Sequence, residues 1–591
     1  AKPCRIALPP CFYKMFSDRS ELDVALTKRT SDAPNLLRAY IRLWTLWQLV
    51  ESSVLSAFVS FLLGTSDNNG TLESHSSVMF SCVFAVTLLA VNLHPNLPCV
   101  ITALAVAVGS KVYAIPFIYD FEYWSIQTQL SVLCFSLKAF VDNRARPLTE
   151  DQQNALIEAC GAVVRIQMTI LYSAAGVWKL NSSFCDPEIS CAPVLFVQLL
   201  ARFLPIATSS PVLVNFIVHA APTLTIVVEL AIPILFAQPP GRLQVLGVAL
   251  GLLFHFVILC APSPNNAGAF AVTAASFYFF FLPHEAASSM GANFNGLSPR
   301  SVFMIIVISF GALISALNHD YAFPAYFAFL AIFVPALLES WGKHEKHSLG
   351  RGKRQTLMGI AFISLAGVYA YVLPVLGLLD MGAATMFANL HVYNDFNHYF
   401  LPTGLLFRLH ERYGATCEDS LFSGGLLRVD GTTSNHMKKI FPAEVTAMLW
   451  PPQVHELLRG AGHTGRQFDP YETRVLGSGF IEKDVHGPFV PYVLPAVELR
   501  RLLAEASSLG ENFTLIYTKL RSETDIRQEQ VHLTEIAGRL HTCTVLPAGG
   551  DCGPCEVPLQ RPLQWWVRKL LLFFPIPVKP GTQKRELGCI A

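Results

Sequence analysis

The chain has 591 residues, of which 52% are hydrophobic and only 14% are charged, and its formal net charge is +1. Soluble globular proteins carry about 25% charged residues, and a chain of this length needs polar side chains to cover its surface. The near-zero net charge shows no basic bias that would point to nucleic acid, so no nucleic-acid partner is expected. The composition therefore predicts a membrane protein, much of whose surface is covered by lipid.

The N-terminal arm, residues 1–38, is polar and mixed in charge, and it contains no apolar run long enough for the core of a signal peptide. From residue 39 to residue 380, apolar stretches follow one another, many of them close to the roughly 20 residues that cross a bilayer core of ~30 Å. This region is predicted to be a transmembrane helical domain. Its candidate spans are 41–64, 78–94, 98–118, 123–141, 155–180, 193–218, 221–237, 243–261, 266–283, 301–318, 321–339 and 356–379.

Lysine and arginine in the short loops predict the orientation. The N-terminal arm and the loop Lys343–Arg354 are both basic and are both expected in the cytoplasm, which requires an even number of spans between them. The candidates between them are odd in number, so one is not a span, and 193–218 is the weakest. The last span then leaves the C-terminal part on the lumenal or exterior side, with the endoplasmic reticulum as the expected compartment. The glycosylation sequons at Asn69 and Asn512 agree with this orientation.

In residues 381–560 charges, glycine and proline return, and we expect a water-facing domain. Alternating side chains predict a strand at Phe513–Tyr517, and Ala496–Leu509 is expected to form a short helix. The tail, residues 561–591, begins with the aromatic and basic run Trp565–Phe574, which is typical of a helix in the membrane interface. The predicted fold class is an all-α polytopic membrane bundle of about 9–12 helices, followed by a smaller mixed α/β or β-rich water-facing domain.

Three polar side chains, Arg165, Tyr172 and Lys179, recur at intervals of seven within one predicted span. On a helix they share one face, where they either line a cavity or, for the two cations, extend to lipid headgroups at the helix ends. Glu229 and His255 stand among apolar residues in later spans. Each either ties two helices together or forms a proton-handling site with the amine of Lys179. Charge inside a bilayer is costly, so a functional site at these positions is the working hypothesis.

Five short motifs follow one another along the chain, in the segments Arg165–Leu180, Glu229–Pro233, Phe254–His255, Met386–Pro402 and Tyr492–Arg501. In residues and in order they resemble the signatures of the HTTM (horizontally transferred transmembrane) family, which includes the vitamin K-dependent γ-glutamyl carboxylases. The resemblance extends over roughly residues 40–505.

This resemblance implies a quinone-driven reaction. A lysine deprotonates reduced vitamin K, or another quinone in its reduced form, and oxygen converts it to a strong base. That base removes the γ-proton of a glutamate in a peptide substrate, and carbon dioxide adds. The lysine of the matching Gly-x-x-Lys-Leu pattern is Lys179, with His255 and Glu229 as further candidate catalytic residues. The candidates for binding substrate or lipid are Arg165, Tyr172, Asn397 and His398.

The chain departs from the family at Tyr123–Gln129, which contains no histidine where the family holds its oxygenated intermediate with one. Membership of the HTTM family therefore does not by itself imply carboxylation. Two other functions stay open. One is a transporter whose path is lined by the ionisable residues, and the other is a lipid-binding membrane scaffold in which those residues join helices.

Two cysteine pairs are candidates for disulfide bonds. Cys552 and Cys555 form a Cys-Gly-Pro-Cys motif, but the flanking glycines and proline favour a loop disulfide over a redox site, which needs a helix at the first cysteine. Cys185 and Cys191 flank a predicted lumenal loop. A zinc site would need four ligands within tetrahedral reach, so no metal is expected.

Overall fold

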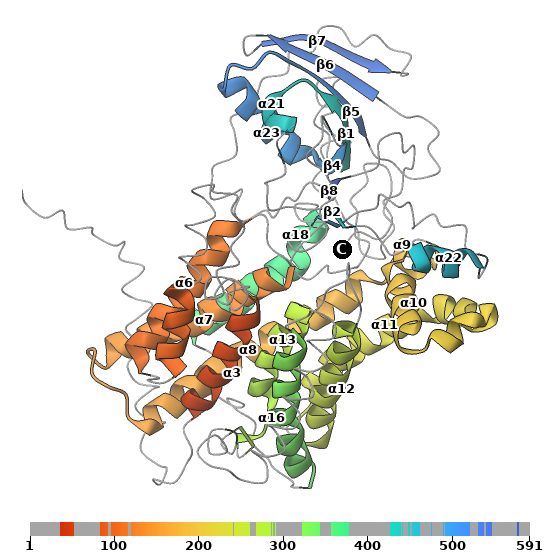
Figure 1. Cartoon of the computed structure of the whole chain (residues 1–591). Helices are drawn as coiled ribbons and strands as arrows, with labels where there is room; N and C mark the ends of the chain where they lie inside the picture. The colour runs from red at the N-terminus through yellow and green to blue at the C-terminus, as the bar shows by residue number, and fades with distance from the viewer. Residues whose placement is uncertain are drawn as a thin grey trace, which may run out of the picture.

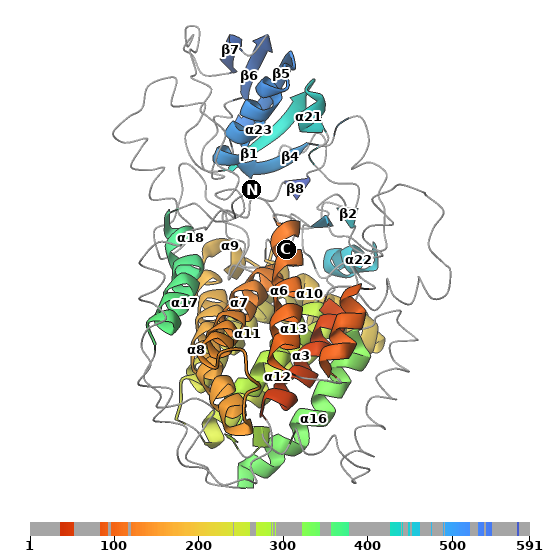
Figure 2. The same ribbon diagram turned by 90° about the vertical axis from the view of Figure 1, so that its left-hand side faces the viewer.

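The computed structural model has a helical body in residues 36–376 and a smaller part with a β-sheet in residues 426–577 (Figure 1). Figure 2 shows the sheet at one end of the helical body. Of the body, the structure describes residues 36–51, 83–92, 96–115, 120–260 without 189 and 240, 268–284 with 286, 287 and 290, 322–342 and 356–376. Of the C-terminal part, it describes 426–438, 440, 447–448, 452–460, 462, 474–475, 489, 491–519, 530–536, 539–546 and 576–577.

Helices make up the body, as the composition predicts. Among the described residues, four helical segments are long and apolar enough to cross a membrane: Glu150–Trp178, Pro211–Phe236, Arg242–Leu259 and Leu357–Leu376. The candidate span 301–318 lies outside the described residues. The elements are α3 (Leu36–Glu51), α6 (Leu97–Ala114), α7 (Asp120–Asp142), α8 (Glu150–Trp178), α9 (Ser182–Cys185), α10 (Cys191–Phe203), η1 (Pro205–Ser209), α11 (Pro211–Phe236), α12 (Arg242–Leu259), α13 (Gly268–Phe277), η2 (Tyr278–Phe281), α16 (Ala322–Gly342), α17 (Leu357–Gly367), η4 (Val368–Val372) and α18 (Leu373–Leu376).

The chain between α10 and α11 overturns one predicted span. The hydropathy of the sequence predicts a span over 193–218, but α10 ends at Phe203 and a 3₁₀ turn separates it from α11. Pro211 occupies the first turn of α11, where its missing N–H is not needed, and the Ser210 side chain caps the helix. From there α11 continues through Pro222 to Phe236, so it joins the end of the candidate span 193–218 to the candidate span 221–237. The loop charges require that one candidate is not a span, and the overturned one is the candidate named above as the weakest.

α8 is the central helix of the body and packs against α7, α11 and α17. It begins with a reciprocal capping box between Thr149 and Gln152. At its other end, the indole N–H of Trp178 donates to the carbonyl oxygen of Ala370 at 2.7 Å. Ala370 lies in η4, a π-helical turn of the kind often found near functional sites. α8 is therefore held at both ends, which fixes the position of the residue that follows it, Lys179.

The C-terminal part holds a six-stranded sheet with strand order β7-β6-β5-β1-β4-β8. Its paired strands are antiparallel. The predicted strand at Phe513–Tyr517 and the predicted helix at Ala496–Leu509 are confirmed as β5 and α23. The elements are β1 (Leu426–Thr432), α21 (Asn435–Lys438), β2 (Ala447–Met448), α22 (Pro452–Gly460), β3 (Arg474–Val475), β4 (Tyr492–Pro495), α23 (Ala496–Ser508), β5 (Phe513–Lys519), β6 (Gln530–Ile536), β7 (Arg539–Leu546) and β8 (Ile576–Pro577).

One helix of the C-terminal part, α22, packs on the helical body beside α9 and α10 (Figure 1). Its Leu458 is buried in an apolar cluster with Val194 and Val197 of α10 and with Val214 and Val218 of α11. Burial of a leucine side chain stabilises a contact by roughly 1.5–3 kcal/mol. The C-terminal part is therefore joined to the same two helices that form the site described next.

Candidate functional site

A cavity of about 220 Å³ lies among α8, α10, α11 and α12. Most of its lining is aliphatic or aromatic, which makes it a site for an apolar ligand with a few polar groups to orient it. The lining residues are Leu171, Tyr172, Ala175, Lys179, Phe184, Ala192, Leu195, Phe196, Leu199, Leu224, Thr225, Val228, Glu229, Leu250, Leu253, Phe254, Val257, Ile258 and Phe270.

Two leucines of the lining also belong to the outer surface of the body. Leu224 of α11 is 48% exposed and Leu253 of α12 is 59% exposed. α11 and α12 are consecutive helices that pack against each other. The cavity therefore reaches the outer surface of the body along this pair of helices.

Lys179 is the C-cap residue of α8, and its side chain is only 3% exposed. The side chain folds back along the helix, so that Nζ donates to the carbonyl oxygen of Ala175 at 3.4 Å. Nζ also lies 2.8 Å from Oε2 of Glu229 and 5.7 Å from the centre of the Phe184 ring. Of the two alternatives left open by the sequence for Lys179, the structure shows the lined cavity, since this residue belongs to its lining.

Glu229 lies on α11 with its side chain 10% exposed. One turn later, Pro233 lacks the N–H that would bond the backbone carbonyl of Glu229, which loosens the helix at this point. α11 approaches α8 closely at Gly176, where a Cβ would lie 2.6 Å from Cδ2 of Leu230. The glycine thus lets the two helices come near enough for the carboxylate to reach Lys179.

Behind the cavity wall, two tyrosine hydroxyls form a chain with His255. The Tyr172 hydroxyl lies 2.5 Å from Nε2 of His255 and is also hydrogen-bonded to the Tyr278 hydroxyl. His255 and Tyr278 are fully buried, and neither belongs to the cavity lining. Gly251 leaves space for Tyr278, since a Cβ there would lie 2.5 Å from its hydroxyl oxygen. The expected group of catalytic residues is therefore divided into an ion pair and a separate tyrosine–histidine chain.

The remaining candidate residues lie elsewhere. Arg165 is half-buried on α8, where its Nε donates to the Gly161 carbonyl at 3.4 Å, and it is not part of the cavity lining. Of the predicted stripe, only Tyr172 and Lys179 therefore reach the cavity. The candidates Asn397, His398, Cys552 and Cys555 lie outside the described residues.

The disulfide expected between Cys185 and Cys191 is not formed, because Cys185 is a free thiol in the structure. Cys185 ends α9 and Cys191 begins α10. The turn between them is held by its own backbone, with the Ser190 N–H donating to the carbonyl oxygen of Asp186 at 2.9 Å.

Sequence reasoning missed two residues at this site, Tyr278 and Phe184. Tyr278 stands in a run of phenylalanines, Tyr278–Phe281, and Phe184 lies in the short helix α9. A tyrosine within a strongly apolar run is a usable signal, because its buried hydroxyl needs a hydrogen-bond partner. Phe184 carries no comparable signal, since its role depends on where the chain turns after α8.

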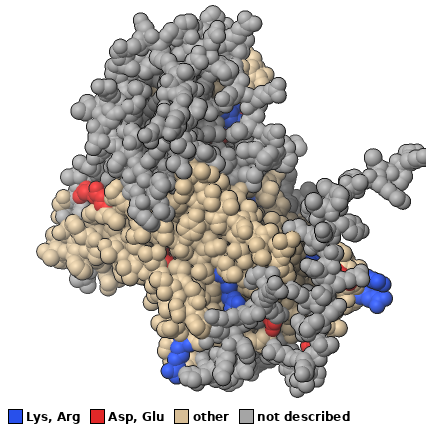
Figure 3. All heavy atoms as spheres, turned by 180° about the vertical axis from the view of Figure 1, so that it is seen from behind, with Lys and Arg blue, Asp and Glu red and all other residues tan. Residues whose placement is uncertain are grey.

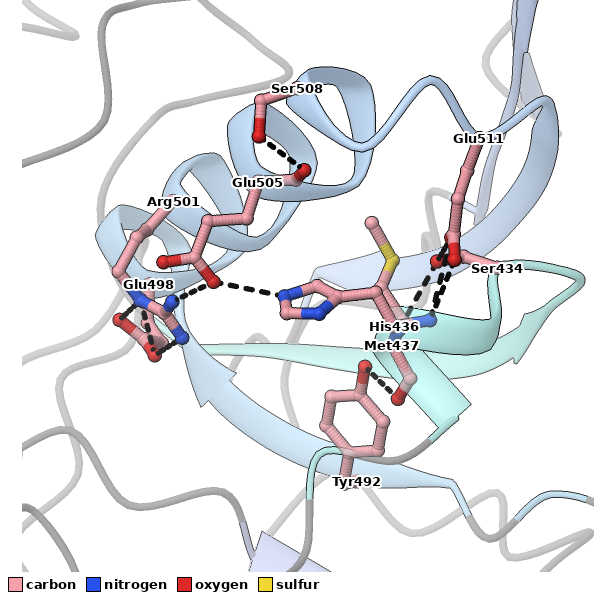
Figure 4. A network of polar contacts seen from close by, with 9 residues as sticks. All are labelled: Ser434, His436, Met437, Tyr492, Glu498, Arg501, Glu505, Ser508 and Glu511. Atoms are coloured by element: carbon pink, nitrogen blue, oxygen red, sulfur yellow. Dashed lines mark hydrogen bonds and ion pairs between the residues drawn. The ribbon is translucent and has the colours of Figure 1, made fainter.

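A second polar network lies in the C-terminal part, between α21 and α23 (Figure 4). The Arg501 guanidinium is 3% exposed, donates to both carboxylate oxygens of Glu498 through Nε at 2.8 Å, and pairs with Glu505. Nε2 of His436 lies 2.9 Å from Glu505. Burial lowers the pKa of Arg501, but the hydrogen bonds and charges of the two carboxylates outweigh it and raise this pKa. The network therefore holds a charged arginine on α23 and, through Glu505 and His436, links α23 to α21. We interpret it as a structural contact.

Replacing Arg501 with lysine is expected to lower the free energy of unfolding by about 1–2 kcal/mol. Lysine keeps the charge but lacks the planar fork that binds two carboxylates at once. Hydrogen exchange of the α23 amides in the full-length protein would measure the loss. Arg459→Lys on the exposed side of α22 is the matched control and should leave exchange unchanged. Equal protection of α23 in both variants would contradict the role of the fork.

Comparisons with known proteins bear on the C-terminal part. Residues 396–569 match a family described as a domain of unknown function (DUF8388). The match covers less than half of the chain and contains none of the residues that line the cavity. No curated protein and no solved structure matches the chain. Among the described residues, no group of three or more His, Cys, Asp or Glu side chains could hold a metal ion.

Proposed function

We propose that this chain is an integral membrane protein that binds a lipophilic hydroquinone in the cavity and takes a proton from its hydroxyl group with the Lys179–Glu229 pair. The observation that carries the proposal is a buried ion pair in the wall of an otherwise apolar cavity that reaches the outer surface. The ligand class, reduced vitamin K or another quinone, follows from the resemblance to the HTTM carboxylases.

The outer surface of the helical body supports a location in the membrane. Figure 3 shows a broad uncharged surface over the described residues, with Lys and Arg mainly toward its lower end. On α11, which is long enough to span, Val212, Phe216 and Ile234 are 80%, 68% and 61% exposed. In water such a surface would drive association, whereas lipid covers it without cost. The loop charges would then place the C-terminal part on the lumenal or exterior side of that membrane.

A hydroquinone suits this cavity on physical grounds. Its ring and tail are apolar, and its hydroxyl is a weak acid with a pKa near that of tyrosine, about 10. A cation beside the oxygen stabilises the anion strongly where the dielectric constant is low. Reaction of the anion with oxygen, and carboxylation of a glutamyl peptide, are the later steps that the resemblance implies. The ion pair of the cavity acts in the first step.

The purified protein in lipid nanodiscs is expected to convert reduced vitamin K to its epoxide. Lys179→Ala is expected to lower the rate at least about 100-fold, because it disrupts the pair that takes the proton. Fixation of carbon dioxide into a glutamyl peptide, measured in parallel, reports whether carboxylation follows. Lys138→Ala, which removes a lysine paired with Asp142 outside the cavity, is the control and should keep the native rate. A folded native protein that neither binds nor oxidises reduced vitamin K would contradict the proposal.

The same cavity favours a second candidate, a lipid-binding protein without a reaction. The exposed leucines Leu224 and Leu253 would admit an acyl chain from the bilayer, and the ion pair would meet a headgroup. The test is whether a lipid copurifies with the native protein and is lost when a larger side chain replaces Ala175 in the cavity wall. That result, together with no turnover of reduced vitamin K, would support this candidate.

A further inference from the structure

Four features of the structure favour the charged form of Lys179. Its Nζ pairs with Glu229 at 2.8 Å, donates to the Ala175 carbonyl, and lies over the face of the Phe184 ring. It also stands at the C-terminal end of α8, where the helix dipole is negative. Each of these partners attracts an ammonium more strongly than a neutral amine. An ammonium has no lone pair, so in this arrangement it cannot accept a proton from a ligand.

Glu229, in contrast, can accept a proton from a ligand. Its carboxylate carries lone pairs and belongs to the cavity lining, where it is the one carboxylate among the described lining residues. The imidazole of His255, the other base in this region, bonds Tyr172 and lies behind the wall. The position of Glu229 therefore gives a ligand hydroxyl direct access to a base, with a cation already beside it.

We propose that Glu229 is the proton acceptor of the site and that Lys179 remains an ammonium that stabilises the ligand anion. This inference rests on the proposed function and assigns a separate role to each member of the ion pair. In the step, the O–H bond of the hydroquinone breaks and its electron pair stays on the ligand oxygen. The proton bonds to a carboxylate oxygen of Glu229, and the ammonium then pairs with the ligand oxygen in place of the carboxylate.

The charge balance of this step favours it over proton transfer to a neutral amine. The site begins with one positive and one negative charge and ends with one of each, so no new charge appears in the cavity. A neutral amine taking the proton would create two charges in an apolar wall, and isolated charges there are strongly disfavoured. Moving a charge over a few ångströms beside the same ammonium costs far less.

Three variants separate the two roles. Lys179→Arg keeps a cation that cannot act as a base, because arginine does not lose its proton in proteins. Glu229→Gln removes the carboxylate but leaves the amine. Glu229→Asp keeps the carboxylate on a shorter side chain. If Glu229 is the acceptor, the first and third variants retain function that the second loses.

The experiment mixes menadiol, a naphthohydroquinone, with each protein in nanodiscs under anaerobic conditions and follows the rate at which the absorbance of its anion appears, from pH 6 to 9. In the native protein we expect bound menadiol to be ionised at a pH where the free compound is neutral. Glu229→Gln is expected to lower this rate at least about 100-fold, and Lys179→Arg no more than about 10-fold. Ionisation at the native rate in Glu229→Gln, or loss of ionisation in Lys179→Arg, would overturn the inference.

Binding of menadione, the oxidised form with no proton to lose, is the control for the integrity of the site. Each variant should bind menadione within a few-fold of the native protein. If Glu229→Gln does not bind menadione, Glu229→Asp takes its place, and it should still ionise menadiol because it keeps a carboxylate. Native protein that binds menadione and menadiol without ionising menadiol would overturn the inference while leaving the cavity as a binding site. Native protein that binds neither would overturn the proposed function itself.

Discussion

Replacement of Lys179 with methionine is expected to lower the free energy of unfolding by about 3–5 kcal/mol, the usual cost of removing one partner of a buried ion pair. Methionine matches the length of the lysine stem, so the loss of packing is small. What remains is the carboxylate of Glu229, 10% exposed and without its cation. Thermal unfolding in detergent, followed by tryptophan fluorescence, would measure the change.

The matched control is the double variant Lys179→Met with Glu229→Leu, which removes both charges together. Replacing a buried ion pair with apolar side chains of similar volume is often neutral or even stabilising. We therefore expect the double variant to regain most of the stability that the single variant loses, although it should not ionise a hydroquinone. A double variant as unstable as Lys179→Met would contradict the ion pair as the source of the loss.

Gly251→Ala is expected to lower the free energy of unfolding by about 2–3 kcal/mol, near the upper end for one added methyl group in a packed core. The new Cβ would lie 2.5 Å from the Tyr278 hydroxyl oxygen and 2.7 Å from Cζ of the same ring. Because Tyr278 is fully buried, its ring has little freedom to withdraw. Its shift would break the hydrogen bond to Tyr172 and disturb the cavity wall.

Gly109→Ala is the matched control for this glycine. It lies on α6, and a Cβ there would meet no atom within 4 Å. Alanine is the better helix former, so this variant should be as stable as the native protein or more stable by up to about 1 kcal/mol. Adding Tyr278→Phe to Gly251→Ala should recover part of the loss, since it removes the closest atom. Equal stability of Gly251→Ala and Gly109→Ala in thermal unfolding would contradict the steric account.

The individual site residues could be predicted from the sequence, but their grouping could not. Lys179, Glu229 and His255 stand out because ionisable side chains are rare within apolar segments. Which of them meet depends on how α8, α11 and α12 pack, and in particular on Gly176, which brings α11 close to α8. The structure pairs Lys179 with Glu229 and places His255 against Tyr172. No local pattern carries that information, because the partners lie on different helices.

Helical periodicity predicted the polar stripe only in part. Residues seven apart on a helix are separated by about 10 Å along its axis, so Arg165 lies about 20 Å from Lys179 along α8. Tyr172 and Lys179 therefore line the cavity, while Arg165 lies outside it. The folding back of Lys179 toward Ala175 adds to this effect, because it moves the amine one turn nearer to Tyr172.

By itself, the sequence determined the helical body, the strand at Phe513–Tyr517 and the helix at Ala496–Leu509, because these depend on composition and on periodicity over short distances. Only the tertiary structure decided that 193–218 is a short helix and the start of a long one, that Cys185 stays a free thiol, and that a cavity forms beside the ion pair. Proline and cysteine spacing leave those outcomes open, because each depends on contacts between segments far apart in the chain. Packing between helices therefore creates the site, from residues that the sequence could identify one at a time.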